Sequence, residues 1–145
     1  LSAAVLSQAM RSREIHRTYQ AFALGETAAS GTIDAPIARL DGSLIQRTVD
    51  FASGERSVTH YRTLAHCSVF SHLELNLETG RTHQIRVHMA YIGHPLLGDT
   101  LYNKTPGTFP RQALHSASLS FVHPITGEPL NFHAPLPEDM QNLLT

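Results

Sequence analysis

The chain has 145 residues, 41% of them apolar, and a formal net charge of 11 − 12 = −1 at pH 7. This length fits one domain, and no apolar run reaches the roughly 18–20 residues that a membrane-spanning helix needs. The first ten residues lack the pattern of a signal peptide. The single cysteine, Cys67, excludes an internal disulfide. We therefore expect a reducing, cytoplasmic compartment and a buried Cys67 thiol.

Apolar periodicity and turn residues predict a series of short elements. In chain order these are a helix over Ala3–Met10, a strand over Thr18–Leu24, a loop over 28–32, a hairpin turn at Asp41-Gly42, strands over Ser57–Leu64, Val69–Leu77 and His115–Phe121, a turn at Thr126-Gly127 and a strand over Leu130–His133. Several strands joined by hairpins, with a few helices, predict an α+β fold on a mixed, mostly antiparallel sheet.

Two helices are predicted in the second half of the chain. The first has helical spacing of apolar residues and a stop signal, carried by Ile85, Met89, Ile92, Gly93 and Pro95. Thr82 is its expected N-cap. A short final helix is expected to open at Pro137, where Glu138 and Asp139 favour its amino end.

The segment Glu78–Met89 is unusually polar for a junction between a strand and a helix. It holds two arginines, two histidines and a glutamine, and such groups must be hydrogen-bonded or paired when buried. On a helix, Arg86 lies about 100° from Ile85 and borders the apolar face, where it can reach a carboxylate. Arg81 precedes the first turn, where anions are favoured. The alternative is two arginines that cover the sheet edge with their stems.

The histidines of this segment do not suggest a metal site. His83 and His88 are five residues apart, which is about 140° of rotation on a helix, so their rings diverge. We therefore expect no metal. Asp99 follows in a loop and is expected to cap an element or to pair with an arginine, rather than to act in catalysis.

The segment Gly80–His88 resembles the Gly-Arg-Thr-His-Gln-Ile-Arg-Val-His signature of the RluA-type pseudouridine synthases, which isomerise uridine to pseudouridine in ribosomal and transfer RNA. Further matches follow the family's order along the chain: Arg17-Thr18-Tyr19, Gly93–Pro95, Gly98-Asp99, Tyr102, 111–115, 119–124 and 134–137. The resemblance implies the catalytic fold of that family, rRNA or tRNA as partner, and no cofactor, metal or membrane.

The resemblance also implies the roles of individual residues. Tyr19 would stack on the target base with its hydroxyl near the reacting atoms, and Leu114 would form an apolar wall below the base. Arg86 would pair with the catalytic aspartate. Arg81 is a weaker candidate for that pairing or for a phosphate contact. The alternative for Tyr19 and Leu114 is ordinary core packing.

The family's nucleophilic aspartate has no match in this sequence. It lies in a His-Arg-Leu-Asp segment before the tyrosine motif, whereas no aspartate precedes Tyr19 in this sequence. Arg39-Leu40-Asp41 follows Tyr19 and lacks the histidine, so we interpret it as a hairpin turn. Residues 1–145 are thus expected to be the carboxyl-terminal portion of a catalytic domain, without the nucleophilic Asp and inactive alone. The alternative is a non-catalytic RNA-binding or structural fragment that retains the fold.

Overall fold

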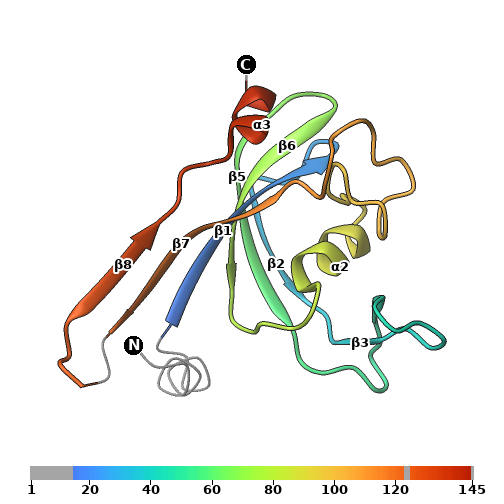
Figure 1. Cartoon of the computed structure of the whole chain (residues 1–145). Coiled ribbons are helices and arrows are strands. Elements are labelled where there is room, and N and C mark those ends of the chain that lie inside the picture. Colours follow the sequence, from blue (N-terminus) through green and yellow to red (C-terminus); the bar gives the residue numbers. More distant parts are fainter. Residues whose placement is uncertain (1–14, 123–124, 145) are drawn as a thin grey trace.

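Six strands form the main sheet, in the order β2-β5-β6-β1-β7-β8 (Figure 1). The computed structural model describes residues 15–122 and 125–144. The strands are β1 (Ile15–Leu24), β2 (Ser30–Asp34), β5 (Val58–His66), β6 (Phe70–Leu77), β7 (Leu114–Val122) and β8 (Pro129–His133). All strand pairs in the described residues are antiparallel. The predicted α+β fold is confirmed.

A separate hairpin and three helical segments complete the described chain. β3 (Ile37–Arg39) pairs with β4 (Arg47–Val49) and, through Ile37, forms an isolated bridge to Glu55. Asp41 lies in the turn between the two strands, as predicted. The helical segments are α2 (Gln84–Tyr91), α3 (Glu138–Gln141) and the 3-10 helix η1 (Asn142–Leu144). None of the described helices has the length and apolarity that crossing a membrane requires.

Most predicted strands are confirmed with shifted ends, but details of the loops differ. β2 begins at Ser30, inside the predicted loop. Val69 precedes β6 and is 63% exposed, so it does not belong to the apolar face of that strand. Cys67 is exposed in the turn between β5 and β6, and the expectation of a buried thiol is wrong. The predicted helix over Ala3–Met10 lies outside the described residues.

The amino end of α2 also differs from the prediction. Its N-cap residue is His83, not Thr82, with a left-handed φ of 57° and no side-chain cap hydrogen bond. The side chain of Gln84, the first residue of the helix, turns back toward the preceding loop. Its Oε1 accepts the backbone N–H of Arg81 at 3.0 Å. The helix therefore begins where a buried glutamine can reach back to the chain before it.

The core lies between α2 and one face of the sheet. Ala21 and Ala23 of β1 and Leu73 and Leu75 of β6 are fully buried on this face, next to Met89 of α2. α2 lies against this face of the sheet (Figure 1). On the opposite face, Phe22, Ala113 and Met140 form a second cluster. Met140 belongs to α3.

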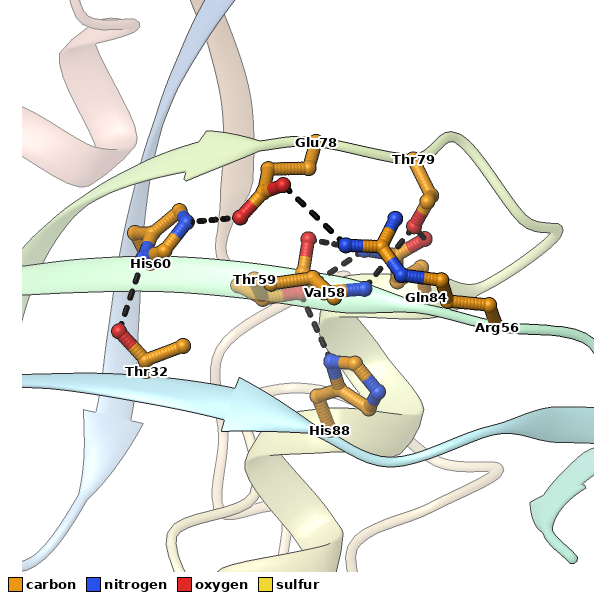
Figure 2. A network of polar contacts seen from close by, with 9 residues as sticks. All are labelled: Thr32, Arg56, Val58, Thr59, His60, Glu78, Thr79, Gln84 and His88. Atoms are coloured by element: carbon orange, nitrogen blue, oxygen red, sulfur yellow. Dashed lines mark hydrogen bonds and ion pairs between the residues drawn. The ribbon is translucent and has the colours of Figure 1, made fainter. Parts of the chain in front are cut away.

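Polar side chains of α2 also point into the sheet, and each of them is hydrogen-bonded (Figure 2). The Gln84 amide nitrogen donates to the Val58 carbonyl and to the Thr59 hydroxyl, both at 3.0 Å. Thr59 Oγ1 lies 2.8 Å from His88 Nδ1, and His88 Nε2 lies 2.8 Å from the Ala35 carbonyl oxygen. A buried row of hydrogen bonds thus joins α2 to β5 and to the end of β2.

This row requires a neutral His88. The Ala35 carbonyl can only accept, so Nε2 carries the proton and Nδ1 accepts from the Thr59 hydroxyl. A protonated Nδ1 would donate to the Thr59 hydroxyl and remove the acceptor that the hydroxyl proton has in the neutral form. Burial lowers the pKa of His88, whose side chain is fully buried. Burial likewise lowers the pKa of His72.

We predict that the protein loses stability as the pH falls below about 6.5, because the unfolded state then binds protons that the folded histidines do not. His88→Gln should make the slope of unfolding free energy against pH shallower by up to about 1.4 kcal/mol per pH unit in that range. Urea unfolding between pH 5 and pH 8 measures this slope. His133→Gln, at an exposed position of β8, is the control. An equal slope in the wild type and His88→Gln would contradict the prediction.

Candidate active site

Arg86 and Asp99 form a buried ion pair with a forked geometry. Arg86 Nε donates to Asp99 Oδ2 and Nη2 donates to Oδ1, both at 2.9 Å. The Arg86 side chain is 14% exposed and the Asp99 side chain 0%. The expectation that Asp99 caps an element or pairs with an arginine is confirmed. Arg86 borders the apolar face of α2, as its spacing from Ile85 predicted, and its partner within the described residues is Asp99.

Asp99 is tied into its own loop as well as to Arg86. Its Oδ1 accepts the backbone N–H groups of Leu101 at 3.1 Å and Tyr102 at 3.2 Å. Burial by itself would raise the pKa of Asp99, but the hydrogen bonds and charge of Arg86, with these two N–H groups, lower it overall. The carboxylate is therefore ionised at neutral pH and fixes one edge of the Arg86 guanidinium.

Tyr102 links the ion pair to the hairpin. The Arg86 guanidinium carbon lies 5.1 Å from the centre of the Tyr102 ring. The Tyr102 hydroxyl accepts the Arg47 backbone N–H at 2.9 Å and forms a second hydrogen bond, 2.7 Å long, with His83 Nδ1. Burial lowers the pKa of His83, and the charges of Arg86 and Arg47 add to the effect. His83 is thus neutral at pH 7.

Sequence reasoning named Tyr102 only as a motif match and missed its contact with His83. The left-handed backbone of His83 turns its ring toward a residue 19 positions later, and no spacing rule indicates such a contact. The available signal was that His83 and Tyr102 both belong to motifs of the same family.

Tyr19 and Leu114 lie on neighbouring strands and pack against the same apolar cluster, on the face of the sheet that α2 covers. Tyr19 of β1 pairs with Ser116 of β7, and Leu114 pairs with Ala21, two residues further along β1. Both side chains are partly buried and pack against the cluster that contains Ile85 of α2. The helix that carries Arg86 therefore contacts the cluster to which both predicted base contacts belong.

Arg81 lies apart from the Arg86 pair. Its Nη1 contacts Glu55 Oε2 at 3.0 Å, and its Nε donates to the Arg56 carbonyl at 3.0 Å. It lines a hollow beside the hairpin rather than the contact between Arg86 and Asp99. Of the two arginines weighed for a carboxylate partner, Arg86 is the one that holds a buried carboxylate in the described structure.

Gly98 positions Asp99 because no other residue fits its place. Its φ is +73°, and a Cβ there would overlap the backbone carbonyl of Arg111. Gly107 has a similar φ of +75°, but a Cβ at that position would meet no other atom within 4 Å, which makes Gly107 a matched control.

We predict that Gly98→Ala lowers the free energy of unfolding by about 1 to 3 kcal/mol more than Gly107→Ala does. Both substitutions strain a left-handed backbone, whereas only the first forces backbone atoms apart. Chemical denaturation of the two variants measures the difference. Equal losses would contradict the overlap.

Comparisons with known proteins show the family of this chain. The model of the RNA pseudouridylate synthase family matches residues 2–91. An uncharacterized RNA pseudouridine synthase of Bacillus subtilis is 50% identical over 97% of this chain and 50% of its own length. The ribosomal large subunit pseudouridine synthase D of Vibrio cholerae is 47% identical over 93% of this chain and 46% of its own. The chain spans about half the length of these relatives.

Solved structures give the same result for the fold. Human RNA pseudouridylate synthase domain containing 1 superposes with a TM-score of 0.79 at 26% identity, over 93% of this chain and 61% of that one. Human RNA pseudouridylate synthase domain containing 4 superposes with a TM-score of 0.78 at 22% identity, over 96% and 64%, and supports the fold alone. By sequence and by fold, the chain belongs to the RNA pseudouridylate synthase family.

Proposed function

We propose that the intact protein is an RNA pseudouridine synthase that acts on ribosomal RNA in the cytoplasm, and that residues 1–145 are the carboxyl-terminal portion of its catalytic domain. The single observation that carries the proposal is the pair of hydrogen bonds by which Asp99 holds the guanidinium of Arg86. Arg86 belongs to the segment that matches the family's signature. The ribosomal substrate is inferred from relatives whose names give the large ribosomal subunit. Transfer RNA is the competing substrate.

Arg86 is proposed to pair with a catalytic aspartate. Asp99 occupies its Nε and Nη2, and Nη1 has no hydrogen-bond partner among the described residues. A second carboxylate at Nη1 would have its ionised form favoured by the guanidinium charge and its position fixed by an immobile donor. In this proposal Asp99 orients Arg86, and Arg86 orients the nucleophile.

Tyr19 and Leu114 are proposed to hold the target base. The uridine must leave its stack before its ring can be reached, and an aromatic side chain offers a replacement stacking partner. Base–aromatic stacking is worth about 1–3 kcal/mol, comparable with the few kcal/mol that extrusion costs. Leu114 lies opposite Ala21 in the register of β1 and β7, diagonal to Tyr19, and would bound the base from the sheet.

The reaction needs no redox partner, because it is an isomerisation. The bond from ribose C1′ to uracil N1 breaks, a bond from C1′ to C5 forms, and the proton leaves C5 while N1 gains one. The aspartate that assists this exchange is proposed to come from a part of the intact protein outside these 145 residues, since no aspartate precedes Tyr19. The same observation favours the second candidate, a non-catalytic RNA-binding protein with this fold.

We predict that the 145-residue chain alone releases no tritium from RNA labelled at uridine C5, whereas the intact protein does. The measurement is the tritium released into water, with ribosomal and transfer RNA offered separately. Circular dichroism of the isolated chain is the control for folding. Turnover by the isolated chain would refute the missing nucleophile. An intact protein that binds RNA but releases no tritium would favour the non-catalytic candidate.

We predict that Arg86→Lys in the intact protein lowers turnover by at least about 100-fold, because an ammonium group cannot hold two carboxylates in a fork. Lysine keeps a positive charge beside Asp99, so Arg86→Lys tests the geometry with less loss of folding than alanine would cause. Single-turnover tritium release and the midpoint of thermal unfolding are measured together. Arg62→Lys is the matched control, because Arg62 forms an ion pair with Glu74 but its side chain is 64% exposed. Normal turnover in Arg86→Lys would remove this residue from the site.

A further inference from the structure

A polar hollow of about 450 Å³ lies between the β3–β4 hairpin and the turn that precedes α2. We call it the hairpin hollow. Its charged lining consists of Arg39, Arg47, Arg81 and Glu55. Three positive groups against one negative group give a local charge of +2 in a protein whose formal net charge is −1. A concentration of arginine in one concave site is unusual for a chain with this overall balance.

Two of the arginines face each other across the hairpin. Arg39 and Arg47 are directly opposed in the antiparallel register of β3 and β4. Side chains in that relation start about 4.5–5.5 Å apart on the same side of the ribbon, and like charges there destabilise the pairing. The hairpin has three residue pairs in all, and one of them is this repulsive one.

Neither of these two guanidinium groups has an acidic partner in the described residues. Arg47 Nη1 donates to the backbone carbonyls of Ile45 at 3.1 Å and Gln46 at 3.5 Å. Arg39 is exposed, and its side chain makes no hydrogen bond or ion pair within the part of the chain that the structure describes. An anion placed between the two groups would convert their repulsion into two attractions.

The third arginine is held by an ion pair that an anion can replace. The Arg81 side chain is 38% exposed and that of Glu55 is 72% exposed, so water screens their 3.0 Å contact. Arg81 Nε stays bound to the Arg56 carbonyl and keeps the guanidinium at the rim of the hollow. Glu55 thus acts as a weak internal competitor for the place of an external anion.

The hollow is also joined to the Arg86 site by a short path. The backbone N–H of Arg47 donates to the Tyr102 hydroxyl, and the Tyr102 ring lies against the Arg86 guanidinium. α2 and β4 are in contact, and Figure 1 shows the hairpin next to the amino end of α2. The hairpin and the Arg86 site are therefore adjacent in the structure.

We propose that the hairpin hollow binds a backbone phosphodiester of the RNA substrate, through the forked guanidinium groups of Arg39, Arg47 and Arg81. Planar guanidinium groups match phosphate oxygens in pairs. This inference rests on the proposed function, because it takes RNA as the partner, and it assigns a site that holds the strand away from the reacting base.

Two features favour an RNA strand over a free phosphate ion, which has the same chemistry. The volume is in the range of sites for whole organic ligands, about 300–1,000 Å³, and exceeds what one phosphate ion needs. The hairpin tip next to the hollow also exposes Leu44 by 88% and Ile45 by 62%, and these apolar side chains can pack against the sugar and base that flank a phosphodiester.

The test is the salt dependence of RNA binding by the intact protein. Each phosphate contact that is lost should lower the slope of log K against log salt by about 0.7 for a single strand. We expect Arg39→Gln and Arg47→Gln each to weaken binding of a labelled RNA several-fold, to a similar extent for different sequences, and to lower that slope. Arg62→Gln, which removes an arginine from β5, should leave the slope unchanged.

A second variant tests the proposal even if the arginine variants fold poorly. Glu55→Gln removes the competing carboxylate and leaves the backbone pairing of this residue with Ile37 intact. It should strengthen RNA binding several-fold. Unchanged binding in Glu55→Gln, or an unchanged slope in well-folded Arg39→Gln, would overturn the proposal.

A titration with inorganic phosphate at constant ionic strength separates the two sources of the anion. One outcome would overturn the RNA assignment: phosphate binds tightly and needs Arg39, whereas RNA binding does not need Arg39. The hollow would then be assigned to a free anion. Failure of the proposed function looks different, because it appears as no tritium release by the unsubstituted protein. An unsubstituted protein that releases tritium while its hollow variants retain the salt slope would refute only the hollow.

Discussion

The buried pair of Arg86 and Asp99 is the interaction on which the site depends. A guanidinium that is 14% exposed is tolerated only with a charged partner and good geometry, and the two 2.9 Å hydrogen bonds supply both. Asp99 in turn needs the N–H groups of its own loop and a glycine before it. The position of one arginine on α2 is therefore set by a loop that follows the helix.

The same logic governs the rest of α2. The helix faces the sheet with both apolar and polar side chains, and every buried polar side-chain atom in the described residues has a hydrogen-bond partner. Gln84 and His88 bind β5 and the end of β2, whereas Met89 packs over β1 and β6. Polar partners fix the rotation of the helix about its axis, which apolar packing alone specifies poorly. A fixed rotation is what a forked arginine requires.

The β3–β4 hairpin extends the site without belonging to the main sheet. Tyr102 fastens it to the loop that carries Asp99, and its three pairs include two opposed arginines. Local charge repulsion in so short an element is a cost to folding, and binding of an anion offsets such a cost. Recognition of RNA and stability of the hairpin are coupled in this way in our proposal.

The sequence determined the fold class, most strands and the borders of α2 to within a few residues, because period-two and helical spacing reflect which face of each element is buried. It also placed Arg86 at the edge of the apolar face, and the family signature in Gly80–His88 indicated the chemistry. The roles of Tyr19, Leu114, Arg81 and Arg86 in the reaction remain predictions.

Only the tertiary structure decided the partners of these residues. The contact of Arg86 with Asp99 spans 13 positions, and that of Arg47 with Tyr102 spans 55. The N-cap of α2 moved from Thr82 to His83 because Gln84 has buried partners on β5, which no local rule takes into account. Periodicity reports which side of an element is buried. Which groups meet there depends on how loops and strands that are distant in sequence converge.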